Sequence, residues 1–313
     1  VDFLAGMALL SQCCCKWRAL GCYPTLVAIL FLLFPASSRA SSLWYWDHEA
    51  ANWNVRTATN KAGGLAYVAA TRFMNQHRAA GLRSSTLRAN LCVGTALTNA
   101  MSPIIRDYGT TSDITWGSAS PSYTQADGLT WGTSDAVTKT GVDPASTSMS
   151  SNSVGYMVYI GGATGRESAS HGAALWGASG IETLGIAPAY TAVGEGGSAW
   201  RNAGQAFGAA ETNGTGFFMV SRIGGATNST VVYAQGRKAG ESTSSGGTTF
   251  TTTGAAGLLY GANNAGNTVQ ERSTKSGRGY MITLGWTEAQ VQNSFRIWQR
   301  FQMTIPGRMV AQY

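Results

Sequence analysis

Two carboxylates separated by one residue are the first candidates for acid–base chemistry in this sequence of 313 residues. Asp47 and Glu49 flank His48, and alternate residues of an extended segment share one face, as two acids that flank a glycosidic bond must do. The same residues follow the aromatic run 44–46 and also fit a solvated polar patch. We favour the polar patch and assign no catalytic residue. Because the remaining acids are scattered along the chain, an acid pair assembled through space stays open.

Other catalytic and cofactor motifs are absent or weak. The sequence contains no serine nucleophile elbow (G-x-S-x-G), no H-E-x-x-H and no P-loop. Residues 194–199 match G-x-G-x-x-A, but they lie in a Gly-rich loop without the flanking strand and helix of a dinucleotide site. Cys92 lies among apolar residues and fits a buried filler better than a nucleophile. The other cysteines lie within residues 13–22, so no disulfide framework extends through the rest of the chain.

Sugar recognition is the binding chemistry that the aromatic residues favour. It needs an exposed ring to stack on the sugar and polar groups to bind the hydroxyls. The candidates near predicted loops are Trp176, Tyr190, Trp200 and Tyr260, with Asn263 beside the last of them. Each aromatic also fits a core or rim position. These five residues form the predicted ligand-binding set.

Two amphipathic helices frame the segments that carry these residues. In NKAGGLAYVAATRFMNQHRAAG, the residues from Tyr67 to His77 that recur at spacings of three and four predict a helix of about 18 residues. We interpret His77, on its apolar face, as a partly buried packing residue and not as a base. Near the C-terminus, Thr287 and Gln290 form a capping box. The apolar stripe that follows predicts a helix that packs on a sheet and closes one end of it: Val291, Phe295, Trp298 and Phe301.

Period-two patterns replace the helical ones after Tyr108. SVGYMVYI and GFFMVSRI alternate between two faces, VVYAQGRKAGES indicates a hairpin turning at 236–238, and GLLYGANN and GYMITLGW indicate further strands. No helical pattern separates them, which excludes a parallel βαβ construction. Before them, Ser84 to Met101 fits either a second helix or a strand. The sequence therefore predicts an all-β, two-sheet antiparallel sandwich with an N-terminal helical segment and a C-terminal amphipathic helix.

The order of these segments resembles that of a known family. GLTWGTSDAVTKTGVDPAS, NSVGYMVYI, ETLGIAPAY, GFFMVSRI and RGYMITLGWTEAQVQNSFRIWQRFQMTIPGR are similar to concanavalin A-like jelly-roll domains of the laminin G, pentraxin and lectin type. The version found in uncharacterised tailed-phage surface and tail-associated proteins is the most similar. Over residues 60–310, the resemblance implies a jelly roll in which 91–96 form a strand. The E-x-D-x-E run of the glucanase branch of this fold is absent.

The resemblance also implies Ca²⁺ as a cofactor, because calcium is frequent in this family and takes oxygen ligands from loops. The candidate ligands are Asp143, Asn264 and Asn267. Turn chemistry explains the same residues without a metal. Calcium binding is therefore expected from the resemblance to this family, and the spacing of the residues alone does not predict it.

The N-terminal residues resemble a leader. Lys16 and Arg18 precede an apolar run of ten residues, 25–34, and Ser38-Arg39-Ala40 follows, which is the construction of a secretory signal peptide. A membrane anchor through residues 16–36, if this segment is not cleaved, and a translated upstream segment are the alternatives. We divide the chain into a leader (1–40), a helical lead-in segment (41–108) and a concanavalin A-like sandwich (109–313).

The net charge of +7 comes from basic residues that are scattered singly, whereas a nucleic-acid groove needs a clustered basic stripe. Three hypotheses follow. The first is a non-catalytic surface module that recognises glycans in attachment, or that is a structural component of a virion or cell envelope. The second is a polysaccharide-cleaving enzyme. The third is a purely architectural subunit that contacts neighbouring copies in a homo-oligomer. We expect an extracellular, cell-surface or virion-surface location.

Overall fold

The computed structural model describes the greater part of the chain beyond residue 46. The described residues are 47–56, 64–116, 119–131, 137–143, 147–149, 153–162, 174–177, 180–183, 186, 198–201, 204–207, 214–224, 230–242, 259–260, 262–265, 268–272 and 275–308. They all belong to a single unit, Trp46–Tyr313. The predicted leader lies outside the described residues, and the structure has no break at the predicted boundary between residues 108 and 109.

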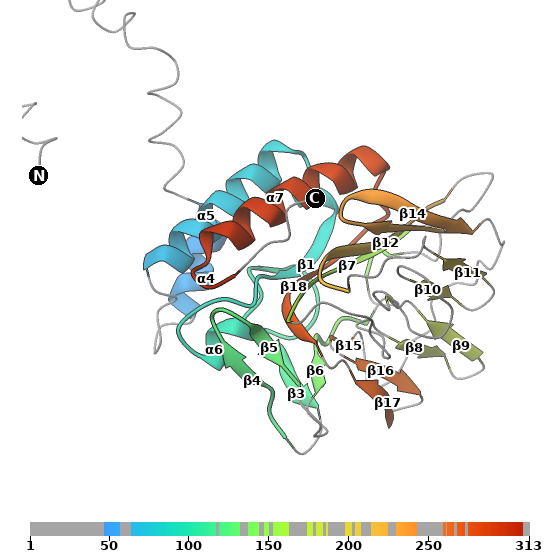
Figure 1. Cartoon of the computed structure of the whole chain (residues 1–313), viewed down its shortest axis with the longest axis horizontal. Helices are drawn as coiled ribbons and strands as arrows, with labels where there is room; N and C mark the ends of the chain where they lie inside the picture. The colour runs from blue at the N-terminus through green and yellow to red at the C-terminus, as the bar shows by residue number, and fades with distance from the viewer. Residues whose placement is uncertain are drawn as a thin grey trace, which may run out of the picture. The chain divides into compact units, whose positions relative to one another are not determined.

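A nine-stranded sheet forms the centre of this unit (Figure 1). Its strands, in spatial order, are β14 (Arg237–Ser242), β13 (Thr230–Ala234), β12 (Gly216–Ile223), β7 (Ser153–Gly161), β18 (Ser276–Thr283), β1 (Thr86–Asn90) and β2 (Ile105–Arg106). In addition, β5 (Gly128–Thr130) pairs with β18, and β4 (Ser122–Thr124) pairs with β5. All strand pairs in the described part of the chain are antiparallel, which confirms the predicted direction.

Smaller sheets lie on one side of this large sheet. One contains β3 (Ile114–Trp116), β6 (Val137–Lys139) and β15 (Leu259–Tyr260). Three hairpins make the others: β8 (Ala174–Gly177) with β9 (Gly180–Thr183), β10 (Ser198–Arg201) with β11 (Gly204–Phe207), and β16 (Ala262–Ala265) with β17 (Thr268–Arg272). The hairpins gather away from the long helices (Figure 1).

Three helices cover the opposite side of the large sheet: α4 (His48–Arg56), α5 (Gly64–Ala79) and α7 (Glu288–Thr304). Helix α5 lies between α4 and α7 and contacts both of them (Figure 1). A short helix, α6 (Leu97–Ala100), and a 3₁₀ turn, η4 (Arg83–Ser85), are the other helical elements in the described part of the chain. The predicted N-terminal helix is thus confirmed, because Ala70, Phe73 and Met74 are buried on its inner face.

The large sheet separates two hydrophobic cores because its strands alternate as the sequence predicts. On β7, Tyr156 and Val158 belong to the core on the side of the small sheets. Met157 and Tyr159 belong to the core under the helices. Adjacent residues of a strand point to opposite faces, so one apolar strand supplies both layers. The centre of the sheet is therefore buried on both faces.

Helix α7 begins with the predicted cap and buries the predicted stripe. The Thr287 Oγ1 accepts a hydrogen bond from the backbone N–H of Gln290, and the Gln290 side chain accepts one from the backbone N–H of Thr287. Trp298 is fully buried, and Phe295 packs edge-on against Phe217 of β12 at 5.7 Å between ring centroids. The helix therefore covers a face of the sheet, and the prediction that it closes one end of the sandwich is wrong. An apolar stripe does not distinguish these two positions.

The first strand of the sheet lies where the sequence was ambiguous. Residues 86–90 form β1, so neither a second helix from Ser84 nor a strand over 91–96 is present. The strand ends at Asn90 because its side chain accepts a hydrogen bond from the backbone N–H of Cys92, whose φ of 47° turns the chain. Cys92 is buried, as predicted. Strands β1 and β2 both precede Tyr108, so the sheet includes part of the predicted helical lead-in segment.

Candidate functional site

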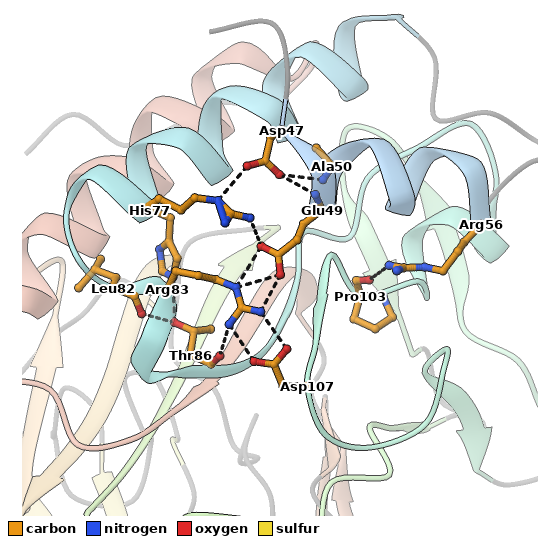
Figure 2. Close-up of polar contacts among 11 residues, drawn as sticks. Asp47, Glu49, Ala50, Arg56, His77, Leu82, Arg83, Thr86, Pro103 and Asp107 are labelled. Atoms are coloured by element: carbon orange, nitrogen blue, oxygen red, sulfur yellow. Dashed lines mark hydrogen bonds and ion pairs between the residues drawn. The ribbon is translucent and has the colours of Figure 1, made fainter. Parts of the chain in front are cut away.

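Asp47 and Glu49, the predicted acid pair, belong to a cluster of ion pairs at the start of α4 (Figure 2). Asp47 Oδ1 accepts hydrogen bonds from the backbone N–H groups of Glu49 and Ala50, at 2.9 and 3.0 Å, and so caps the helix. Its other oxygen accepts from Arg78 Nε at 2.9 Å. Asp47 is only 4% exposed, so our interpretation of this stretch as a solvated patch is wrong.

Arg83 joins this cluster to the loop after β2. Its guanidinium donates to both carboxylate oxygens of Asp107 at 2.8 Å and also to the Glu49 carboxylate (Figure 2). Hydrogen bonds with Asp107, and then with Glu49, raise the pKa of Arg83 despite its partial burial. Glu49 is also paired with Arg78. Three carboxylates thus share two guanidinium groups, and this arrangement fixes α4 and α5 to the sheet.

His77 lies directly beneath this cluster and is a packing residue, as its place on the helix predicts. It is fully buried, more deeply than we expected, and its Nε2 lies 2.8 Å from Thr86 Oγ1. Its ring stacks on Phe73 with 5.5 Å between centroids. Burial, followed by the charges of Arg83 and Arg78, lowers the pKa of His77 to about 3. The imidazole is therefore neutral at neutral pH and has no route to a substrate.

A second charged centre lies inside the sheet, and the sequence gives no local signal for it. Arg88 of β1 and Asp113 are both fully buried and form an ion pair, with 2.6 Å between Nη2 and Oδ1. The Tyr280 hydroxyl donates to the same Asp113 oxygen at 2.7 Å and accepts from Arg88 Nε at 2.9 Å. Asn90 donates to the other Asp113 oxygen at 2.7 Å. Burial raises the pKa of the Tyr280 hydroxyl, which stays protonated and serves as a donor.

This second centre has a structural role, because its members form hydrogen bonds with one another and with backbone carbonyl groups. Arg88 also donates to the carbonyl oxygens of Tyr108 and Thr110, both at 2.9 Å. Buried charges are tolerated when their hydrogen bonds are complete, and removal of one partner then costs about 3–5 kcal/mol. Both carboxylate oxygens of Asp113 therefore already accept hydrogen bonds, and the residue is not positioned to act as a general acid or base.

The predicted sugar-binding residues lie in different environments. Tyr260 is fully buried, and its hydroxyl donates to the Gly279 carbonyl at 3.0 Å. Its ring packs against Trp131 and Tyr280, both at 4.9 Å, so it is a core residue and does not present a stacking surface. Trp176 lies on β8, Trp200 on β10 and Asn263 on β16. Tyr190 lies outside the described residues.

The backbone brings the strands that carry these three residues close together. Strand β16 contacts β8, and β10 contacts β9, the partner of β8. Trp176 pairs with Ile181 in its hairpin, and Trp200 pairs with Gln205 in the next. Residues that are far apart in the sequence therefore occupy neighbouring hairpins. Sequence reasoning selected the residue types but gave no reason for this adjacency.

The candidate calcium ligands are also divided among these regions. Asp143 is half-buried after β6, Asn264 lies on β16, and Asn267 is outside the described residues. In the described ranges, no three His, Cys, Asp or Glu side chains come together as a metal site would require. No described helix is both long enough and apolar enough to cross a bilayer.

Comparisons with known proteins give only remote similarities. No protein-family model matches the sequence, and no curated protein is significantly similar to it. Among solved structures, the chain is similar to domain 4 of AbnA, an extracellular GH43 arabinanase from Geobacillus stearothermophilus. Their identity is 12% over 67% of this chain and 98% of that domain, with a TM-score of 0.42.

Two further structures are similar at the same level. The CBM40 of the Ruminococcus gnavus IT-sialidase is 11% identical over 48% of this chain and 89% of that module, with a TM-score of 0.31. A Trypanosoma rangeli sialidase mutant is 11% identical over 73% of this chain, with a TM-score of 0.33, and the match covers 38% of the sialidase. Similarity of this size leaves the assignment of function to the residues themselves.

Proposed function

We propose that this chain is a non-catalytic surface module that recognises glycans through the cluster of hairpins β8–β9, β10–β11 and β16–β17. The observation that carries the proposal is the adjacency of these hairpins, since they bear Trp176, Trp200 and Asn263. An aromatic ring stacks on a sugar, and an amide binds its hydroxyls. The proposal includes the concanavalin A-like jelly-roll topology that the sequence resembles.

The engagement of four of the described carboxylates supports binding over catalysis. Glycoside cleavage needs one protonated and one ionised carboxyl group on either side of the bond. Asp47, Glu49, Asp107 and Asp113 are all engaged in ion pairs with arginine side chains. None of these four is therefore free to contact a glycosidic bond.

The wider biological setting is also part of the proposal. A module of this kind acts outside the cell, in attachment to a glycan-bearing surface or as a component of a cell envelope or virion. Calcium binding by Asp143, Asn264 and Asn267, which the family resemblance implies, is also part of the proposal. A purely architectural role in a homo-oligomer is the second candidate.

A glycan array probed with the full chain tests this function. We expect the chain to bind a defined set of glycans. We expect Trp176→Ala and Trp200→Ala each to weaken this binding by about tenfold, since stacking of a ring on an aromatic side chain contributes on the order of 1–3 kcal/mol. Met303→Ala is the matched control, because Met303 is 58% exposed on α7, on the helix side of the sheet. Circular dichroism checks that each variant is folded.

The remaining outcomes separate the alternatives. Release of reducing ends from a bound polysaccharide would assign the chain to the enzymes. An absence of binding on the array, together with a defined oligomer by light scattering, would favour the architectural role. Loss of binding on removal of calcium by a chelator, with the fold intact, would support the metal site.

A further inference from the structure

A groove on the helix side of the molecule has a composition that the proposed function does not use. It lies between α5 and α7 and has a volume of about 160 Å³. We call it the α5–α7 groove. The residues that line it are Ala69, Arg72, Phe73, Gln76, Ile297, Arg300, Phe301 and Thr304. The two helices lie side by side across the large sheet (Figure 1), on the side opposite the hairpin cluster.

The lining has an apolar floor and a basic rim. Phe73, Ile297 and Phe301 are buried and belong to the core under the helices. Arg72 and Arg300, one from each helix, are exposed. The other polar side chains of the lining, Gln76 and Thr304, are uncharged, and the lining contains no acid. The groove therefore carries two positive charges beside an apolar surface.

Among the described residues these two arginines have no acidic partner, in contrast to Arg78 and Arg83. Arg78, further along α5, and Arg83 are both neutralised by Asp47, Glu49 and Asp107. By contrast, neither Arg72 nor Arg300 has an ion pair or hydrogen bond within the described ranges. Arg72 and Arg300 both line the groove, and the ligand that complements their two positive charges is an anion.

The size of the groove limits the ligand to a small molecule. Pockets for drug-sized ligands usually measure about 300–1,000 Å³. An apolar cavity of about 150 Å³ holds one benzene ring. The whole α5–α7 groove has about this volume, and Phe73, Ile297 and Phe301 form the apolar part of its lining. A ligand that fills it consists of a single ring and one charged group.

We propose that the α5–α7 groove binds a small cyclic carboxylate. The ring lies on Phe73, Ile297 and Phe301, and the carboxylate accepts hydrogen bonds from Arg72 and Arg300. Guanidinium groups form paired hydrogen bonds with carboxylates, and these bonds are stronger than those between neutral groups. This site is separate from the hairpin cluster, so the proposal does not depend on glycan binding.

Isothermal titration calorimetry of the full chain with benzoate tests the proposal. We expect saturable binding at one site that weakens as sodium chloride is added, because the charges are exposed. Benzamide has the same ring without the charge, and inorganic phosphate has the charge without the ring. Both are expected to bind at least about tenfold more weakly than benzoate, since each lacks half of the interaction.

Variants locate the binding to the groove. Arg72→Gln and Arg300→Gln should each weaken benzoate binding by about tenfold, and Gln76→Glu should do the same by repelling the carboxylate. Arg296→Gln is the matched control, because Arg296 is exposed on α7 and hydrogen bonds to Asn293 without lining the groove. Since Arg72 and Arg300 are exposed, the variants are expected to fold normally.

Three results would overturn the proposal. The first is an absence of benzoate binding at millimolar concentration. The second is binding that Arg72→Gln and Arg300→Gln leave unchanged. The third is equal affinity for benzoate and phosphate, or for benzoate and benzamide, which would remove the role of the ring or of the charge. A failed glycan array has no bearing on any of them.

Discussion

At neutral pH the His77 ring is uncharged because it is buried and because the positive charges of Arg83 and Arg78 disfavour a second charge on it. Its pKa of about 3 in the folded chain is well below the value of about 6.5 that histidine has in an unfolded chain. Between these two values the unfolded chain binds a proton and the folded chain does not. The free energy of unfolding therefore falls as the pH is lowered below about 6.5.

This difference gives a prediction at the level of one residue. Between pH 7.5 and pH 5.5, the free energy of unfolding in urea should fall by about 1.4 kcal/mol on account of His77. The His77→Gln variant is expected to lose this part of the pH dependence, whatever its stability at pH 7.5. Equal pH profiles for the two proteins would show that His77 takes up a proton in the folded state.

Single residues also mark the limit of what the sequence predicts. The packing role of His77 and the burial of Cys92 follow from their apolar neighbours and are confirmed. The Arg88–Asp113–Tyr280 centre is not predictable in this way, because Arg88 and Tyr280 are separated by 192 residues. The turn residues beside Tyr260 predict a position near a loop, but its ring fills the core. Turn residues locate loops and do not report the direction of a side chain beside them.

Among the elements, those with one clear periodicity are predictable. Helices α5 and α7 and strands β7 and β12 each alternate between two environments, and the structure contains all four. Strand β1 is different because it has only five residues, and its polar residues Arg88 and Asn90 are buried with the others. The pattern of so short a segment does not separate a strand from part of a helix. Arg88 and Asn90 are found in β1 because both belong to the buried Arg88–Asp113–Tyr280 centre.

The seating of α7 on the sheet depends on a glycine in β18. Gly279 has a φ of +150°, and a Cβ at this position would lie 2.4 Å from the Trp298 ring. Gly279→Ala is therefore expected to lower the free energy of unfolding by about 1–3 kcal/mol, as overpacking of a core does. Urea unfolding measures the loss, and near-ultraviolet circular dichroism reports the displaced tryptophan.

Gly64→Ala is the matched control for this prediction. Gly64 is the first residue of α5, and a Cβ there meets no atom within 4 Å. We expect this change to leave stability the same or to raise it by up to about 1 kcal/mol, since alanine favours a helix more than glycine does. Equal effects of the two substitutions would contradict the role of close packing at Gly279.

At the scale of the whole molecule, Arg308 connects segments that are distant in the sequence. Its guanidinium donates to the carbonyl oxygens of Cys92 and Gln125, at 2.6 and 2.8 Å, and to Gln302 Oε1 at 2.8 Å. The side chain is buried, and the three acceptors come from the loop after β1, the turn after β4 and helix α7. One side chain thus joins the loop after β1 and the turn after β4, which both lie on the side of β18 away from β7, to the helix layer.

Arg308→Lys tests whether this geometry matters to global stability. Lysine keeps the charge, but its single nitrogen does not reach the three separated acceptors. We expect a loss of about 2 kcal/mol or more, because buried acceptors are left without donors. Arg300→Lys, on the exposed side of α7, should change stability by less than about 0.5 kcal/mol. If Arg308→Lys changed the free energy of unfolding as little as Arg300→Lys does, Arg308 would act only through its charge.

The position of β18 has a consequence for how the protein forms during synthesis. This strand lies between β7 and β1, both of which are translated long before it. Until residues 276–283 leave the ribosome, the nascent chain holds two apolar strands with unpaired edges. Such edges pair readily with other chains. Closure of the sheet is thus postponed until β18 is made, and a chaperone that covers exposed strands would act on this protein before that point.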